Sequence, residues 1–364
     1  IVPQLHGAAI ALSATTDLPA WLGPAIVILV VLPTVVSGGM RSVTLAQAVQ
    51  YWFKLSALFI PTVFIVLRLG VGDASFIPDL ANAFEVDLVN DTQSSTYRTI
   101  SLVAALMLGT LGLSHVLVRF YTNPDGGTAR RTTVLLLGLL AGFYTLPIIL
   151  GVVARAVLPE LGQSASTDTA LLQLPSALFS GLTGDLLTAL VTGGAFAAFL
   201  STASGLVVSI SGVVSQEFFG GTVRGFRVGA ILAMVLPIVA TFVTTGLALA
   251  GAVAMVFTFT ASSLAPVVLL AIWWRGLTVT GAVSGMVTGG AMSLAALLAG
   301  HLLDDAGLTM AVLQYPALWV VPLVLVVTML VSALGSQRPP ENTDEVLARL
   351  HLPESLKQGT TQSS

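Results

Sequence analysis

Cysteine is absent from this 364-residue chain, and charged residues are scarce. Without cysteine the chain can form neither a disulfide nor a thiolate metal site. Only 9% of the residues are charged, whereas soluble domains carry about 25%. Because 55% of the residues are hydrophobic and the mean hydropathy is +0.95, lipid must cover much of the surface. The four histidines show no metal-ligand spacing, and a net charge of −3 gives no reason to expect a nucleic acid partner.

Nine apolar runs are long enough to cross a bilayer as helices, which takes about 20 residues. They comprise residues 21–38, 45–67, 100–120, 133–158, 186–214, 228–245, 251–274, 279–298 and 316–334. Backbone groups must be hydrogen bonded within the chain in hydrocarbon, and runs without polar alternation favour helices over barrel strands. We therefore predict an all-α, polytopic membrane protein with about nine transmembrane helices.

Lysine and arginine divide unequally between alternate connections of these runs. One set of connections carries ten basic residues and the other carries three. The first set holds Arg41, Arg119, Arg130, Arg131, Arg224, Arg227, Arg275, Arg338, Arg349 and Lys357, and the second holds Arg68, Arg98 and Arg155. Because basic residues favour the cytoplasmic side, the chain should start outside and end in the cytoplasm. The long connections 70–99 and 159–185 should then lie outside.

The two ends of the sequence carry separate expectations. The chain begins at Ile1 rather than at methionine, which suggests a fragment that lacks its first helices. A transmembrane domain should occupy residues 1–336, followed by a polar cytoplasmic tail at 337–364. Within the tail, residues 343–357 form either one short helix on the membrane surface or a solvated segment.

The run 186–214 gathers small and hydroxyl residues, which allow two interpretations. One is close helix packing, with the hydroxyls bonded to the backbone. The other is a cation site, because the hydroxyls of Ser201 and Thr202 and the carbonyl of Ala198, one turn earlier, offer three neutral oxygens. Sodium is a hard cation that takes oxygen ligands, by the same logic as calcium and magnesium.

Four segments resemble motifs of the sodium/solute symporter family. Residues 198–204, Ala-Phe-Leu-Ser-Thr-Ala-Ser, resemble its Ala-Ala-x-x-Ser-Thr-x-x-Ser signature. Residues 109–122 resemble its Gly-Thr-x-Gly-x-Pro-His-x-x-x-Arg-Phe segment, with Ser114 where the family usually has proline. Segments 38–44 and 262–266 also match. Among subfamilies, the chain most resembles the bacterial cation/acetate and monocarboxylate symporters.

This resemblance implies the leucine-transporter type of fold, in which two inverted five-helix repeats surround a site at the middle of the membrane. The helices between residues 100 and 274 would form the second repeat, and the first core helices of the first repeat would be missing. The protein would lie in the bacterial inner membrane.

Two further places in the sequence carry candidate site residues. Gly109, Gly112, Ser114 and His115 lie where the second repeat should have a broken helix, so we expect them to contact or gate the substrate; the alternative is glycine flexibility in a packed helix. Lys54 lies midway along an apolar run, and a charge within the membrane is by default a functional hypothesis. It can pair with a substrate carboxylate, occupy the space that another transporter gives to a cation, or pair with backbone carbonyls inside the bundle.

The resemblance and the residues together predict sodium-coupled uptake of a small organic anion, a monocarboxylate such as acetate, with a sodium ion at Ala198, Ser201 and Thr202. The alternatives are a proton-coupled transporter and a symporter-like membrane sensor, although the tail is too short for a kinase domain. A membrane-embedded enzyme would need His, Asp or Glu clustered within the apolar runs, and the sequence shows none. The expected partners are the organic anion and the lipid bilayer, with no nucleic acid.

Overall fold

The computed structural model describes residues 1–72, 92–113, 116, 125–158, 168–243, 249–302 and 307–351. All regular structure in these ranges is helical, without strands. Eight segments of the described chain are long and apolar enough to span a membrane. They are Leu22–Gly39, Ser42–Gly70, Gly126–Val157, Gly181–Phe219, Val223–Thr241, Gly251–Trp273, Val279–Gly300 and Ala317–Leu334. These segments match eight of the nine predicted runs and confirm an all-α polytopic membrane protein. The remaining run, 100–120, extends into residues outside the described ranges.

The chain forms two compact units, each assembled from separate stretches of sequence. Unit 1 comprises Ile1–Asp87 and Arg131–Ala250, and unit 2 comprises Leu88–Arg130 and Gly251–Ser364. Unit 1 contains α1 (Val2–Thr15), α2 (Leu22–Gly72), most of α6 (Gly126–Val157), α7 (Ala170–Leu178), α8 (Gly181–Phe219) and α9 (Val223–Val243). Unit 2 contains α4 (Thr92–Leu111), nearly all of α10 (Leu249–Ser263), α11 (Ala265–Trp273), α12 (Val279–Leu302), α13 (Leu308–Gln314), α14 (Ala317–Leu334) and α15 (Thr343–His351).

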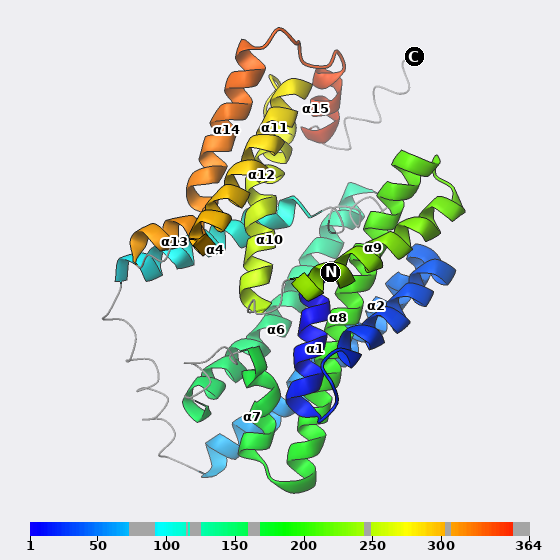
Figure 1. Ribbon diagram of the computed structural model, residues 1–364, viewed down its shortest axis with the longest axis vertical. Coiled ribbons are helices and arrows are strands. Elements are labelled where there is room, and N and C mark those ends of the chain that lie inside the picture. Colours follow the sequence, from blue (N-terminus) through cyan, green and yellow to red (C-terminus); the bar gives the residue numbers. More distant parts are fainter. Residues whose placement is uncertain are drawn as a thin grey trace. The chain divides into compact units, whose positions relative to one another are not determined.

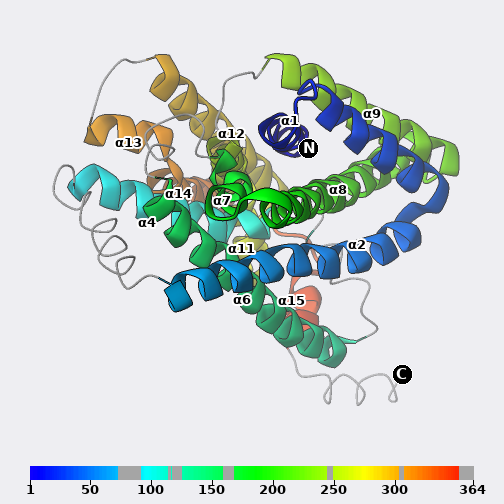
Figure 2. The same cartoon turned by 90° about the horizontal axis from the view of Figure 1, so that it is seen from below.

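Helix α8 is the centre of unit 1, where α1, α2, α7 and α9 all pack against it (Figures 1 and 2). Small residues permit this crowding, as they do in many membrane helix pairs. A Cβ added at Gly194 of α8 would collide with the Cβ of Ala57 on α2. A Cβ at Gly229 of α9 would lie 2.8 Å from the Cα of Ser211 on α8. The main core of the unit joins buried residues of four helices: Leu5, Ala8, Val27, Val31, Val35, Val43, Ala203, Val207, Ala230, Ala233 and Met234.

Helix α2 is two helices separated by a sharp break at Gly39, where φ is 56° and ψ is −154°. Only glycine adopts this backbone conformation without strain. The break separates the first predicted run from the second, and it lies within the segment 38–44 that resembles a family motif.

In unit 2, α12 and α14 lie side by side, again through glycines. Added Cβ atoms at Gly281 and Gly285 of α12 would collide with Ser332 and Thr328 of α14. At the other end of α14, the hydroxyl of Tyr97 on α4 donates to the carbonyl of Tyr315 at 3.1 Å. The unit is therefore tied together at both ends.

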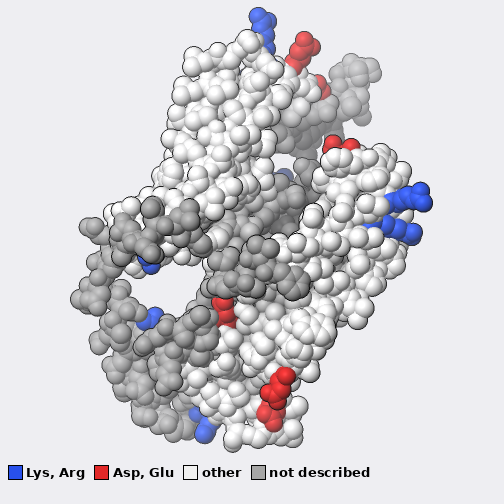
Figure 3. Space-filling model, viewed as in Figure 1, with Lys and Arg blue, Asp and Glu red and all other residues white. Residues whose placement is uncertain are grey.

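The exterior of the helices is largely uncharged on the face shown in Figure 3, where the visible Lys, Arg, Asp and Glu lie mostly near helix ends. Many large apolar side chains are exposed along the spans, among them Leu29, Leu236 and Val287. Such a surface requires lipid rather than water around it.

Within each unit, hydrogen bonds join two connections between helices. In each case, the alternation of the spanning helices predicts that both connections lie on the same side of the membrane. In unit 1, the Asp168 carboxylate accepts a hydrogen bond from the amide of Leu249 at 2.6 Å, which joins the connections before α7 and before α10. In unit 2, the amide of Thr280 donates to the side-chain oxygen of Gln337 at 3.3 Å, which joins the α11–α12 connection to the tail.

The structure also contains three helices that are too short to appear as long apolar runs in the sequence. α1, α7 and α13 have 14, 9 and 7 residues, too few to cross a bilayer. α7 lies within the predicted loop 159–185, and α4 begins at Thr92, inside the predicted loop 70–99, so both loops are shorter than expected. In the tail, α15 shows that residues 343–351 are helical, and their location at the membrane surface stays a prediction. The remaining residues, 352–357, lie outside the described part.

Candidate functional site

The three predicted sodium ligands lie in the middle of α8, which is helical from Gly181 to Phe219. Two faces of this helix are covered by neighbours. Ala203 and Val207 face the core shared with α1 and α9, and Gly194 faces Ala57 of α2. A third face carries Ala198 and, one turn later, Thr202. Ala198 is half-buried and Thr202 is exposed, whereas Ser201, at the edge of this face, is only 9% exposed.

The hydroxyls of α8 differ in how they are bonded. Thr192, Ser204 and Ser211 each donate to the carbonyl one turn earlier. This is the arrangement that the packing interpretation predicts. Within the described part of the chain, the hydroxyls of Ser201 and Thr202 make no hydrogen bond, and neither does that of Ser209. The two residues of the predicted cation site are therefore not committed to the helix backbone.

Gln47 of α2 adds a contact that the sequence did not reveal. Its side-chain amide donates to the carbonyl of Ser201 at 2.7 Å, in a partly buried position. This bond links α2 to α8 at the residue whose hydroxyl is a predicted sodium ligand. In the sequence, Gln47 is visible only as a polar side chain within an apolar run. Its partner, Ser201, is 154 positions away.

The predicted sodium ligands are neutral oxygens rather than charged groups. In the described ranges, no group of three or more His, Asp or Glu side chains is close enough to hold a metal ion. The oxygens on offer are the neutral carbonyl of Ala198 and the hydroxyls of Ser201 and Thr202. Three neutral oxygens can supply part of the coordination shell of a hard cation. Because none of them is charged, they would not neutralise the charge of the cation.

Lys54 lies on α2 and is half-buried. It follows Gln47 by seven residues, so both lie on one side of the helix, about 10 Å apart along its axis. α2 and α8 run antiparallel here, since Gln47 is opposite Ser201 while Ala57 is opposite Gly194. Along the axis of this helix pair, Lys54 therefore lies on the same side of Ser201 as Ala198 does.

In unit 2, α4 ends within the segment where the sequence predicts a broken helix. The α-helix ends at Leu111, and the following amides bond in tighter turns: Gly112 to the carbonyl of Gly109 at 3.0 Å, and Leu113 to Thr110 at 3.3 Å. Ser114 and His115 lie outside the described residues, so their predicted role stays a prediction.

The two glycines of α4 also have a packing role. A Cβ at Gly109 would lie 2.5 Å from the carbonyl oxygen of Phe257, and one at Gly112 would lie 3.0 Å from that of Thr260. Both contacts are with α10, so glycine is required for the close approach of the two backbones. Packing explains the glycines at these positions, and substrate gating remains a prediction.

The segment 262–266 forms the break between α10 and α11. Pro266 has no amide hydrogen, so the carbonyl of Ser262 lacks its usual helical donor. Gly289 of α12 lies directly against that carbonyl, where a Cβ would collide with it. The Ser262 hydroxyl is fully buried and has no hydrogen-bond partner among the described residues.

Comparison with known proteins agrees with these features. The sequence profile of the Sodium:solute symporter family matches residues 1–289. The chain is 25% identical to the monocarboxylic acid transporter of Corynebacterium glutamicum, over 97% of this chain and 71% of that protein. It is 27% identical to the uncharacterized symporter YwcA of Bacillus subtilis, over 70% of this chain and 52% of that protein, and so covers about half the length of YwcA. The chain belongs to the sodium:solute symporter family, which consists of membrane transporters rather than enzymes.

Proposed function

We propose that this protein couples the inward movement of sodium to the uptake of a small organic anion, a monocarboxylate such as acetate. The observation that carries the proposal is the pair of hydroxyls on Ser201 and Thr202 that are not bonded to the backbone of α8, one turn after Ala198. The proposal of an anionic substrate rests on the similarity to a protein named as a monocarboxylic acid transporter.

In this proposal a sodium ion takes the Ala198 carbonyl and the two hydroxyls as part of its shell. Gln47 is a positioning residue, because its bond to the Ser201 carbonyl fixes the rotation of α8 against α2. Lys54 and the broken end of α4 serve the substrate or its gate, and partly positive helix N-termini suit an anion. Rocking of one helix bundle against the other then releases both solutes. The basic connections and the tail face the cytoplasm.

Removing single hydroxyls tests the sodium site in the full-length protein. Ser201→Ala and Thr202→Ala each delete one oxygen and add no bulk. A lost ligand to a charged group costs about 2 kcal/mol. The sodium concentration for half-maximal uptake should therefore rise about thirty-fold, since 1.4 kcal/mol corresponds to tenfold. The measurement is uptake of labelled acetate against sodium concentration at fixed membrane potential and pH.

Two serines of the same helix serve as controls. Ser209 is also uncommitted but lies about two turns away, and the Ser204 hydroxyl is bonded to the carbonyl of Leu200 at 2.7 Å. Alanine at either position should leave the sodium curve nearly unchanged, because neither hydroxyl is a predicted ligand and the bond of Ser204 lies within α8. If Ser201→Ala and Thr202→Ala also leave it unchanged while a pH gradient still drives uptake, the protein is proton-coupled.

A further inference from the structure

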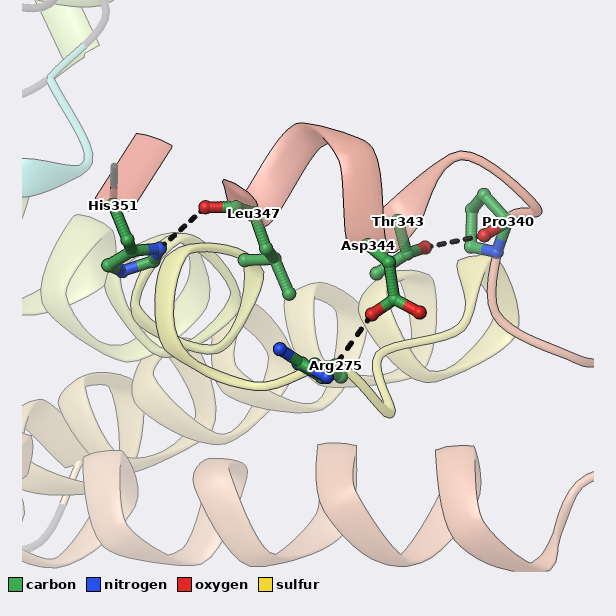
Figure 4. Close-up of polar contacts among 6 residues, drawn as sticks. All are labelled: Arg275, Pro340, Thr343, Asp344, Leu347 and His351. Atoms are coloured by element: carbon green, nitrogen blue, oxygen red, sulfur yellow. Dashed lines mark hydrogen bonds and ion pairs between the residues drawn. The ribbon is translucent and has the colours of Figure 1, made fainter. Parts of the chain in front are cut away.

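The C-terminal helix α15 presents three different faces. The protein face consists of Asp344, Leu347 and His351, which are spaced three and four residues apart (Figure 4). The Asp344 carboxylate lies 3.4 Å from the Arg275 guanidinium, and the His351 ring centre lies 5.0 Å from that of Trp273. Leu347 is only 7% exposed. These contacts attach α15 to the end of α11.

The second face of α15 is apolar and uncovered. Val346 and Leu350 are one turn apart, and their exposed fractions are 44% and 57%. The third face is polar or small, with exposed Glu345 and Ala348. The side of the nine-residue helix that carries Val346 and Leu350 is therefore the one that favours an apolar neighbour.

The position of α15 along the spanning helices indicates what that cover is. The helix is attached at the end of the span Gly251–Trp273, where Trp273 is 72% exposed. Tryptophan is enriched at the headgroup level of bilayers, so this end of α11 marks the membrane surface. The span Ala317–Leu334 ends on the same side, because Gln337 bonds to Thr280 at the start of α12. α15 therefore begins at this level, and it runs alongside the end of α11 (Figure 1).

We propose that α15 is an interfacial helix, with Val346 and Leu350 inserted into the headgroup–acyl boundary of the membrane that the protein spans. Its opposite side is held by Arg275 and Trp273, so the helix lies between protein and lipid. The segment 343–351 contains two acidic residues and one arginine. The attraction is therefore to the apolar layer, and anionic lipid adds nothing to it.

Spin labels on single cysteines test this placement. The 364 residues contain no cysteine, so any cysteine in the rest of the full-length protein is first replaced by serine. Labels are placed on Val346→Cys and Leu350→Cys, with Ala348→Cys as the matched control on the polar face. In proteoliposomes, collisions with oxygen, which concentrates in lipid, are compared with collisions with a water-soluble nickel chelate.

Labels at 346 and 350 should collide several-fold more with oxygen than with the chelate, whereas the label at 348 should show the reverse. The pattern should be the same in neutral vesicles and in vesicles with anionic lipid. Equal access of the chelate to all three labels would overturn the proposal in favour of a solvated helix. Protection of 346 and 350 from both reagents would overturn it in favour of a protein partner.

Discussion

Three hydroxyls of α8 are held by its own backbone, and the two predicted to bind sodium are not. Thr192, Ser204 and Ser211 donate to carbonyls one turn earlier, whereas Ser201 and Thr202 make no such bond among the described residues. A serine or threonine in a membrane helix satisfies its donor most easily in this way. This donation uses the hydroxyl hydrogen and leaves the lone pairs of the oxygen unused. The hydroxyls of Ser201 and Thr202 therefore differ from the other three in that no backbone bond fixes their rotation.

The residue-scale prediction concerns Gln47, which we expect to position the Ser201 carbonyl. Gln47→Leu removes the 2.7 Å bond to that carbonyl and keeps the side chain at a similar size. A neutral hydrogen bond contributes about 1 kcal/mol, so the sodium concentration for half-maximal uptake should rise about five-fold. Maximal uptake per folded transporter should change little, because Gln47 does not contact the substrate in this proposal.

Gln50→Leu is the matched control for this change. The side-chain oxygen of Gln50 is buried without a partner among the described residues, so replacing it should cost little. An equal shift of the sodium curve in both variants, or a loss of protein level without any shift, would show that Gln47 only supports folding.

The sequence singled out individual residues, but it could not show their contacts with other helices. Ser201, Thr202 and Ala198 were singled out because adjacent hydroxyls and a carbonyl one turn earlier are local features of one helix. Gln47 was missed because its partner belongs to another helix, and no periodicity reports a contact across 154 positions. α4 ends at Leu111, within the segment where the glycine spacing predicts a break, but its neighbour α10 was not predicted.

At the scale of helices, α2 and α8 cross closely at Gly194 and Ala57 in unit 1. We predict that Gly194→Ala destabilises the protein by about 1–3 kcal/mol, the usual cost of overfilling a packed interface. Ala57 cannot rotate away, because its side chain is a single methyl group. Thermal unfolding of the solubilised full-length protein should therefore begin several degrees lower.

Gly212→Ala provides the comparison within the same helix, because an added Cβ there meets nothing within 4 Å. It should be neutral or slightly stabilising, since alanine is favoured over glycine in a helix by about 1 kcal/mol. If the two substitutions have equal effects on thermal unfolding, the crossing does not depend on Gly194.

Long apolar helices were predicted well because length and composition decide them. Eight of the nine predicted runs appear among the described residues with boundaries shifted by a few positions. The short helices α1, α7 and α13 were missed for the same reason, since a helix below the membrane thickness leaves no comparable signal. Their positions depend on packing; for example, Leu174 of α7 is buried against Ile65 and Leu150.

At the scale of the whole molecule, the predicted sidedness of the connections stays a prediction, and three contacts within the units are in line with it. Within unit 1 the Asp168–Leu249 bond, and within unit 2 the Tyr97–Tyr315 and Thr280–Gln337 bonds, join connections that alternation places together. The family match extends over residues 1–289 and is independent of these contacts. A symporter with neutral oxygens at its predicted cation site is expected to use sodium rather than a carboxylate proton relay.

The most direct test of sodium coupling is accumulation of labelled acetate by proteoliposomes that contain the full-length protein. The vesicles carry an inward sodium gradient, equal pH on both sides and a membrane potential clamped at zero. We predict transient accumulation above the external concentration, abolished when sodium is equal on both sides. Accumulation that needs a pH gradient and ignores the sodium gradient would contradict the sodium site on α8.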